Sequence, residues 1–229
     1  MKKLLLAATT AAMITGAGAA SAFEISGNIG VASDYIFRGQ SQTGEELSLN
    51  GGFDADLGAG FYAGFWGSNV DFGGDEQLET DLYVGYGFDV NEDISLDFSF
   101  IQFVYIGEQS ALNYQEYVAS LSAYGLDLTV VHSPEYLGDG GESFMYYNIG
   151  YGFDLPYDIS LGLSVGLNDA DDMDITFDGS GDDSYTDYSV SLAKEAYGVE
   201  WGVTYYDTDI GSDNEAADAR VVFSVSKSL

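Results

Sequence analysis

The sequence predicts an all-β protein: a closed up-and-down antiparallel transmembrane β-barrel of about 12 strands. Three observations lead to this prediction. Apolar and polar residues alternate with period two along most of the chain, 30 glycines accompany only 2 prolines, and the connections between alternating segments are short and long in turn. Alternation places successive side chains on opposite faces of a strand, so each strand has one apolar and one polar face.

The first residues have the three parts of a secretory signal peptide. Lys2 and Lys3 precede a short apolar run, and small residues ending in Ala22 form an A-x-A cleavage site. We therefore expect a signal peptide over residues 1–22 and a barrel over residues 23–229. A retained membrane anchor is the alternative, but polar residues break the apolar run, which is too short for a stable spanning helix.

The composition is that of a folded and strongly acidic chain. The sequence has 38 Asp and Glu against 6 Lys and Arg, so its surface would repel nucleic acid and attract cations. Such charge can indicate disorder, but 46% hydrophobic residues with 18 Tyr and 14 Phe argue for a folded protein. There is no cysteine, so disulfides do not stabilise it.

The clearest strand runs from Ile159 to Asn168. Its odd-numbered residues are all apolar and its even-numbered residues are all small or polar, a pattern that a helix would mix on every face. The third and tenth alternating segments are the weakest, so ten or fourteen strands are alternatives to twelve. Strands are predicted over about 23–38, 47–57, 61–69, 78–89, 94–100, 117–121, 126–130, 145–154, 159–168, 188–192, 199–205 and 218–229.

A partial internal repeat and the connection lengths indicate repeated hairpins. Residues 85–96 resemble residues 150–161, and each segment reads as strand, short turn, strand. Connections after the even-numbered strands are short, whereas those after the odd-numbered strands are longer and polar. Short turns on one side and long loops on the other are typical of outer-membrane barrels, and an even strand number puts both termini on the periplasmic side.

The two faces of the predicted strands favour a membrane barrel in the outer membrane of a Gram-negative bacterium. A soluble periplasmic β-protein would also alternate and is the alternative. However, the polar face has almost no Lys or Arg, and aromatic residues gather near strand ends on the apolar face, as in an interfacial girdle. These aromatic residues are Phe37, Phe53, Phe88, Tyr151 and Phe153.

The run Ser33-Asp34-Tyr35-Ile36-Phe37-Arg38-Gly39-Gln40-Ser41-Gln42-Thr43 resembles the N-terminal signature of the TorF family of porins, also catalogued as Gcw_chp proteins. The segment Val221–Leu229 is similar to the last strand of that family, and the resemblance covers essentially the whole chain after the signal peptide. It implies a pore in the outer membrane. One departure is the final Leu229, where outer-membrane barrels usually end in Phe.

The polar face supplies the candidate pore lining. Arg38 and Arg220 are its only cations, and closure of the barrel would make them neighbours at the extracellular mouth. They could face a wall of carboxylates across a constriction, or form a structural ion-pair cluster with Asp34 and Asp218, which we favour. The other carboxylates expected in the lumen are Asp54, Glu79, Asp81, Asp97, Glu116, Asp127 and Glu200.

Other candidate sites have plainer interpretations that we favour. Tyr62, Trp66, Tyr83, Tyr146 and Tyr206 share the polar face and would form a stacking slide or fill the lumen. The acidic stretch 169–183 lacks EF-hand spacing and reads as a solvated loop rather than a calcium site. His132 precedes Ser133, but adjacent strand residues point to opposite faces, so a Ser-His hydrolase is the least favoured possibility.

The sequence therefore predicts a passive channel, without enzymatic activity, for small hydrophilic solutes, cationic or neutral, that pass an acidic lumen. The alternative is a closed structural or adhesive barrel that acts through acidic extracellular loops. No residue pattern implies a cofactor, a dedicated metal site or a nucleic-acid partner. The expected partners are outer-membrane lipid, lipopolysaccharide, the barrel assembly machinery and the permeating solute. Lys194 and Lys227, near periplasmic strand ends, would reach lipid head groups.

Overall fold

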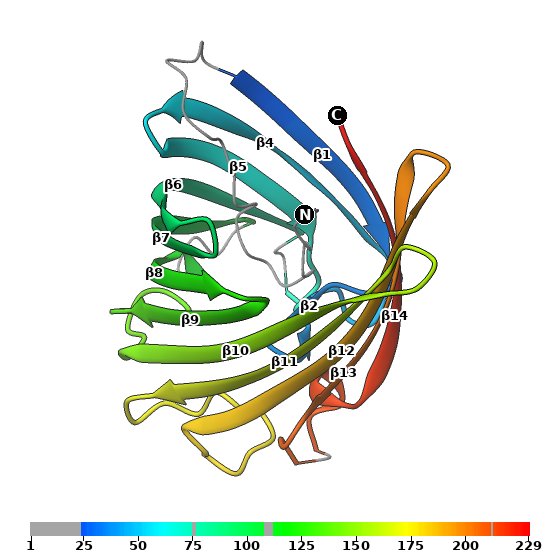
Figure 1. Ribbon diagram of the computed structural model, residues 1–229. Helices are drawn as coiled ribbons and strands as arrows, with labels where there is room; N and C mark the ends of the chain where they lie inside the picture. Colours follow the sequence, from blue (N-terminus) through cyan, green and yellow to red (C-terminus); the bar gives the residue numbers. More distant parts are fainter. Residues whose placement is uncertain (1–23, 75–76, 108–111, 212) are drawn as a thin grey trace.

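The computed structural model describes residues 24–74, 77–107, 112–211 and 213–229, which form one closed antiparallel barrel (Figure 1). The predicted signal peptide lies outside these residues. Within them, the chain also forms a small hairpin of β2 (Ile36–Phe37) and β3 (Gln40–Ser41) and the 3-10 helix η2 (Glu215–Ala217). The barrel strands are β1 (Glu24–Ala32), β4 (Ser48–Gly58), β5 (Phe61–Asn69), β6 (Leu78–Asn91), β7 (Ile94–Ile106), β8 (Tyr114–Ala123), β9 (Leu126–Ser133), β10 (Phe144–Leu155), β11 (Ile159–Ala170), β12 (Ser184–Ala196), β13 (Val199–Thr208) and β14 (Arg220–Ser228).

The barrel closes where its first and last strands meet. β1 pairs with β14 in a register that runs from Asn28 opposite Ser228 to Ala32 opposite Ser224, and its other edge pairs with β4. Every other barrel strand pairs with its neighbours in the chain. The predicted all-β barrel and its count of twelve strands are therefore confirmed, including the two weakest segments, which form β5 and β12.

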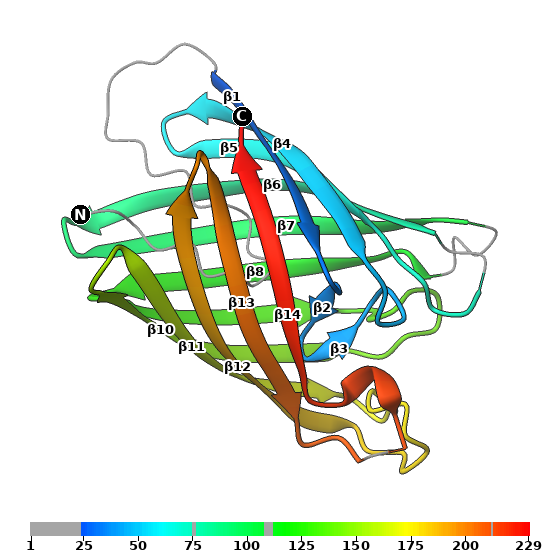
Figure 2. The same cartoon turned by 90° about the vertical axis from the view of Figure 1, so that its right-hand side faces the viewer.

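Short turns join the strands at one rim of the barrel. In the turn between β8 and β9, Tyr124 has φ 54° and Gly125 has φ 85°, the two positive φ values that a two-residue type I′ hairpin requires. Figure 2 shows the start of β1 and the C-terminus at this same rim. The described parts of the longer connections lie at the opposite rim, as the alternation of connection lengths predicts.

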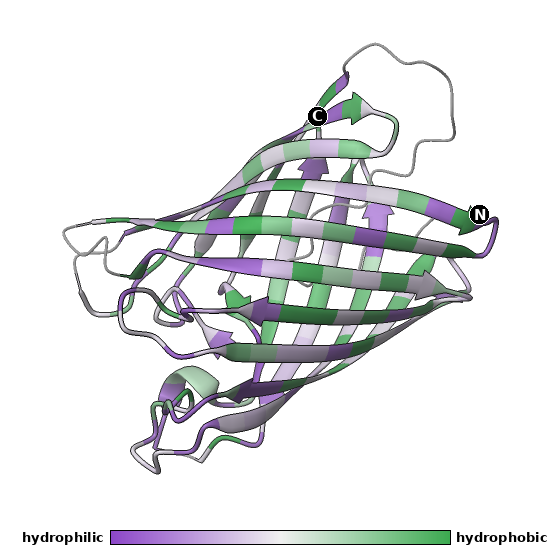
Figure 3. Cartoon of the chain, turned by 90° about the vertical axis from the view of Figure 1, so that its left-hand side faces the viewer, coloured by the Kyte–Doolittle hydropathy of each residue, from purple (hydrophilic) through white to green (hydrophobic). Residues whose placement is uncertain are grey.

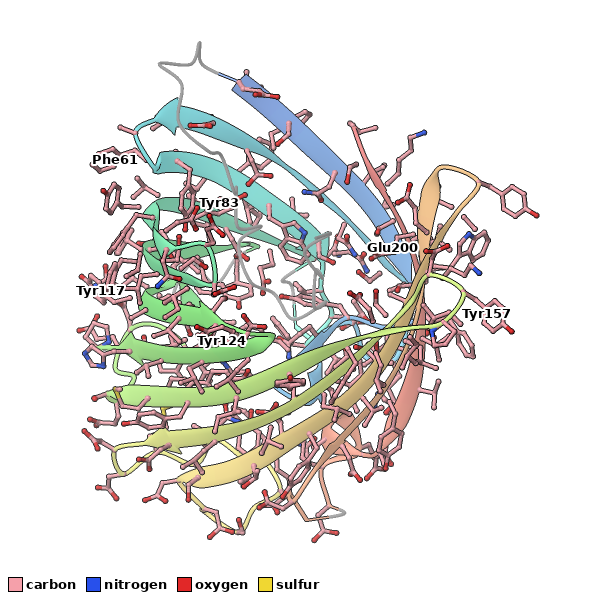
Figure 4. The ribbon with its side chains drawn as sticks, in the orientation of Figure 1. Phe61, Tyr83, Tyr117, Tyr124, Tyr157 and Glu200 are labelled. Atoms are coloured by element: carbon pink, nitrogen blue, oxygen red, sulfur yellow. The ribbon has the colours of Figure 1, made fainter. Side chains whose placement is uncertain are left out.

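The outer surface of the barrel is apolar. Ile25 is 61% exposed, Phe223 is 62% exposed and Leu163 is 39% exposed, whereas Ser164, the next residue along β11, is 8% exposed and faces inward. Hydrophobic and hydrophilic residues alternate along the strands (Figure 3). The side chains of Phe61 and Tyr117 point away from the barrel (Figure 4). A belt of this extent is suited to lipid, and a closed ladder leaves no unpaired strand edge within it. Among the described residues, no helix is long and apolar enough to span a membrane.

The predicted first strand is wrong in its second half. β1 ends at Ala32, and the chain then turns inward and forms the β2–β3 hairpin inside the ring of strands (Figure 1). Tyr35, expected to face lipid, is 7% exposed and donates a hydrogen bond to Glu79. Phe37, expected in the aromatic girdle, lies 6.0 Å from the ring of Phe103, centroid to centroid, inside the barrel. The period-two pattern continues past Ala32 because this end of the lumen is itself aromatic.

Candidate functional site

Carboxylates line the inside of the barrel, as the sequence predicts. Five of the expected lining residues point inward, and each is at most 9% exposed: Asp54, Glu79, Asp81, Asp97 and Glu116. Asp127 and Glu200 also lie on the inner face and are half-buried. Figure 4 shows Tyr83 inside the barrel and Glu200 on β13. A lumen wall with this composition carries concentrated negative charge.

Tyrosines hold several of these carboxylates in place. The hydroxyl of Tyr62 donates to both carboxylate oxygens of Asp97, at 2.8 and 2.9 Å. Tyr83 donates to one oxygen, Oδ1, of Asp54 at 2.5 Å. Because each carboxylate accepts from a neutral hydroxyl, these contacts fix its position without supplying a countercharge. The two tyrosines therefore leave the negative charges of Asp54 and Asp97 uncompensated.

Arg38, at the tip of the β2–β3 hairpin, reaches the opposite wall of the lumen. Its Nη1 lies 2.9 Å from Oε1 of Glu116, and its Nη2 donates to Oε2 at 2.9 Å. The hairpin tip is also held from the other side, because the backbone carbonyl of Arg38 accepts a 3.0 Å hydrogen bond from the hydroxyl of Tyr185 on β12. The hairpin therefore bridges β8 and β12 across the barrel interior.

Arg220 binds different partners, so the expectation that the two arginines are neighbours is wrong. Nη1 of Arg220 lies 2.9 Å from Oδ2 of Asp34, and Nη2 lies 3.2 Å from Oε1 of Glu45. The predicted ion pair with Asp34 is present, but Asp218 is exposed in the last loop and contributes its backbone carbonyl, not its carboxylate. The inward turn of the chain after Ala32 separates Arg38 from Arg220.

Aromatic side chains fill the end of the lumen at the long-loop rim. Phe103 and Tyr114 stack with centroids 4.4 Å apart, and Tyr136 stacks on Phe144 at 4.0 Å. Of the aromatic residues predicted on the inner face, Trp66 and Tyr146 pack against this group. We call it the aromatic cluster; its buried members are Tyr35, Val70, Phe103, Tyr105, Tyr114, Tyr136, Phe144, Ala170, Ile175 and Tyr185.

A cavity lies in the lumen against the hairpin. Residues 36–39 of the hairpin form part of its lining, together with Asp97 and Glu116 from the β7–β8 wall. The rest of the lining is mixed: hydroxylated residues such as Ser120, Thr129, Ser164 and Ser189 alternate with apolar ones such as Val118 and Val131. The hairpin therefore borders both this cavity and the aromatic cluster, whose member Phe103 also lines the cavity.

Sequence reasoning missed Asp187, which belongs to the same inner wall. Asp187 is 7% exposed, and its Oδ2 accepts a 2.9 Å hydrogen bond from Asn168. It also accepts a hydrogen bond from the hydroxyl of Tyr146 at 3.3 Å. The tenth predicted strand began one residue later, at Tyr188; extending its alternation backwards places Asp187 on the inner face.

The remaining candidates lie away from the lumen cavity. His132 faces outward beside Tyr117, at a centroid distance of 6.4 Å, whereas Ser133 is fully buried on the inner face. In the acidic loop, hydrogen bonds from Ser180, and then from Thr176, lower the pKa of Asp178 to about 2. Among the described residues, no group of three or more acidic, His or Cys side chains is placed to hold a metal ion.

Comparison with solved structures shows a likeness in fold to two porins. The KdgM porin shares 12% sequence identity, with 89% of this chain and 99% of that chain covered and a TM-score of 0.58. The NanC porin shares 9% identity, with 89% and 98% covered and a TM-score of 0.55. A search of curated protein sequences gives no match. A family model described as "Bacterial protein of unknown function (Gcw_chp)" matches residues 16–229, and the chain therefore belongs to the Gcw_chp family.

Proposed function

We propose that the protein is an outer-membrane channel for passive diffusion of small hydrophilic solutes, and that it favours cations, with neutral solutes next and anions last. The observation that carries this proposal is the charge of the lumen. Glu79, Asp81 and Asp97 line it without an arginine or lysine bound to them among the described residues, and the two inner arginines are each held in an ion pair. Rings of carboxylates in a pore select for cations.

The barrel wall supports the same proposal. Its apolar outer face suits lipid, while its inner face offers serine and threonine hydroxyls that can exchange hydrogen bonds with a hydrated solute. The likeness in fold to the KdgM and NanC porins agrees with a channel, and the narrower assignment to the TorF porins within the Gcw_chp family is part of this proposal. Passive diffusion needs no cofactor and no catalytic residue.

Planar-bilayer recording on the refolded full-length barrel tests the proposal. We expect stepwise currents from single molecules, with folding of the same sample checked by the heat-dependent shift of its mobility on a gel. Heat-unfolded protein from the same preparation is the control and should give no steps. A folded barrel that inserts into the bilayer and never conducts would contradict the proposal.

A second candidate function is supported by the aromatic cluster. Because this cluster and the hairpin fill the extracellular end of the lumen, a closed structural or adhesive barrel that acts through its acidic loops is the alternative. It predicts no current, and loss of binding to a surface or to lipopolysaccharide when residues 171–183 are replaced by a neutral loop.

We also propose outer-membrane lipid and the barrel assembly machinery as partners, as for any barrel of this architecture.

A further inference from the structure

Arg38 occupies a backbone conformation that disfavours its side chain. Arg38 and Gly39 are the two turn residues of the β2–β3 hairpin, with φ of 50° and 82°. Type I′ turns with two positive φ values prefer Asn, Asp or Gly at these positions, and a left-handed residue with a long side chain costs about 1–2 kcal/mol. The hairpin itself therefore gives no reason for an arginine, and the reason must lie in what the side chain contacts.

The guanidinium of Arg38 lies in a cage of one carboxylate and four aromatic rings. Its two terminal nitrogens face the two oxygens of Glu116, and its Cζ lies 4.6 Å from the ring centroid of Tyr146 and 4.9 Å from that of Phe144. Tyr136 lies at 5.9 Å and Phe37 at 4.5 Å. A planar guanidinium is the cation that satisfies both a carboxylate fork and aromatic faces, which a compact ammonium does less well.

Most of this cage does not belong to the hairpin. Glu116 comes from β8, Phe144 and Tyr146 come from β10, and Tyr136 comes from the loop between β9 and β10. Only Phe37 lies beside Arg38 in the chain. The barrel and one loop thus supply most of the walls around the guanidinium that the hairpin inserts.

The cage borders the lumen cavity, and a further carboxylate, Asp81, lies on the inner face of the barrel. Glu116 and Tyr146 line the cavity together with Phe37 and Arg38. Asp81 is 8% exposed, and its Oδ1 has no hydrogen-bond partner among the described residues. A buried carboxylate without a partner favours the arrival of a further cation.

We propose that Glu116, Tyr136, Phe144 and Tyr146 form a binding site for the guanidinium group of a permeating solute, and that Arg38 is a tethered occupant that competes with it. This inference rests on the proposed channel, because solutes would reach the site through the lumen. The solutes that bind in the lumen would then be small molecules that carry a guanidinium group. A tethered group has a high effective concentration, so it weakens the binding of a free competitor without abolishing the site.

Titration calorimetry on the folded, detergent-solubilised barrel tests the site independently of any current. The probes are methylguanidinium, methylammonium and the neutral methylurea, applied to the native protein and to Arg38→Asn, whose side chain suits a left-handed turn. We expect methylguanidinium to bind Arg38→Asn at least about tenfold more tightly than the native protein, because the tethered competitor is gone. Methylammonium should bind more weakly, and methylurea should not bind.

Two further variants define the site. Arg38→Asn combined with Glu116→Gln should lose the binding gained, and Arg220→Gln, which removes the other inner arginine, should bind methylguanidinium as the native protein does. If Arg38→Asn does not fold, Arg38→Lys takes its place and should bind methylguanidinium more tightly than the native protein, because an ammonium fits the cage less well. A folded Arg38 variant that binds no more tightly than the native protein, or that binds methylurea equally, would overturn the proposal.

Bilayer recording with the same variants separates this inference from the proposed function. Binding by calorimetry in a barrel that never conducts would support the site and contradict the channel. A conducting Arg38→Asn barrel whose current methylguanidinium does not block, and which gives no binding heat, would leave the channel standing and overturn the site.

Discussion

Arg38 and Glu116, 78 residues apart in the chain, are joined across the barrel interior by two contacts of 2.9 Å, and their side chains are 6% and 2% exposed. This ion pair is the link between the inward hairpin and the wall at β8. It also neutralises one carboxylate in a lumen that otherwise carries excess negative charge. The pair therefore bears on both the stability of the barrel and the path through it.

Removing one partner of this pair should destabilise the folded barrel. Glu116→Gln leaves the guanidinium of Arg38 buried without a countercharge, which costs about 3 kcal/mol or more. The urea midpoint of unfolding, followed by tryptophan fluorescence in lipid vesicles, should fall. The double variant Arg38→Gln, Glu116→Gln should recover much of the loss because no unpaired charge remains. Equal stability of the single variant and the native protein would show that the pair is solvated.

An arginine should destabilise the barrel at an outward-facing position of β11 and leave its stability nearly unchanged at an inward-facing position. Leu163→Arg places a guanidinium in the apolar belt and should destabilise the barrel by about 2–4 kcal/mol if it lies near the membrane midplane. Ser164→Arg, one residue along and facing the cavity, is the matched control and should fold with near-native stability. Vesicle-based unfolding measures both. A reversed order would mean that the two faces of the sheet have been exchanged.

Asp178 should titrate far below an ordinary aspartate. Hydrogen bonds from Ser180 and Thr176, together with the backbone amides of Ser180 and Gly211, stabilise its charged form and lower its pKa to about 2. Because the pKa of Asp178 is lower in the folded than in the unfolded state, its ionised carboxylate stabilises the folded loop at pH values above the unfolded pKa of about 4. This stabilisation is lost as the pH falls through about 2. Carbon-13 NMR of the side-chain carboxyl measures the midpoint, and Ser180→Ala should raise it. An ordinary midpoint in the native loop would contradict these contacts.

Gly39→Ala should loosen the hairpin more than the same change elsewhere. A Cβ at Gly39 would lie 2.4 Å from Cγ2 of Thr208 and 3.0 Å from Cβ of Asp187, so the hairpin tip would have to move away from β12 and β13. Gly198 is the control, because its φ of 77° is similar but a Cβ there meets no atom within 4 Å. Hydrogen–deuterium exchange of residues 34–43 should accelerate in Gly39→Ala and not in Gly198→Ala. Equal exchange in both would mean that the tip is not packed against the wall.

The barrel could be predicted from the sequence because the face on which each strand residue lies follows from its own hydropathy and that of its neighbours in the chain. Along Ile159–Ala170, each residue faces either lipid or lumen, so hydropathy alone gives the strand, its faces and, by repetition, the closed sheet. Hydropathy gives the wrong face for Tyr35 and Phe37, because the alternating pattern is the same whether an aromatic side chain contacts lipid or other aromatic rings.

The lining carboxylates were found for the same local reason, whereas their partners were not. Asp54 and Asp97 alternate with apolar neighbours, but nothing local shows that Tyr83 and Tyr62 donate to them. Likewise, the pairing of Arg38 with Glu116 depends on the inward turn after Ala32, which brings together distant parts of the chain. Arg220 was expected beside Asp34, since closure of β1 onto β14 fixes that contact.

The reversal potential of the native barrel in a gradient of potassium chloride tests the anionic lumen most directly. We expect a potential with the sign of cation selectivity, and a smaller one for Asp97→Asn, which removes a lumen charge while keeping an acceptor for Tyr62. A native barrel that conducts with a reversal potential of zero, or with the sign of anion selectivity, would contradict this expectation.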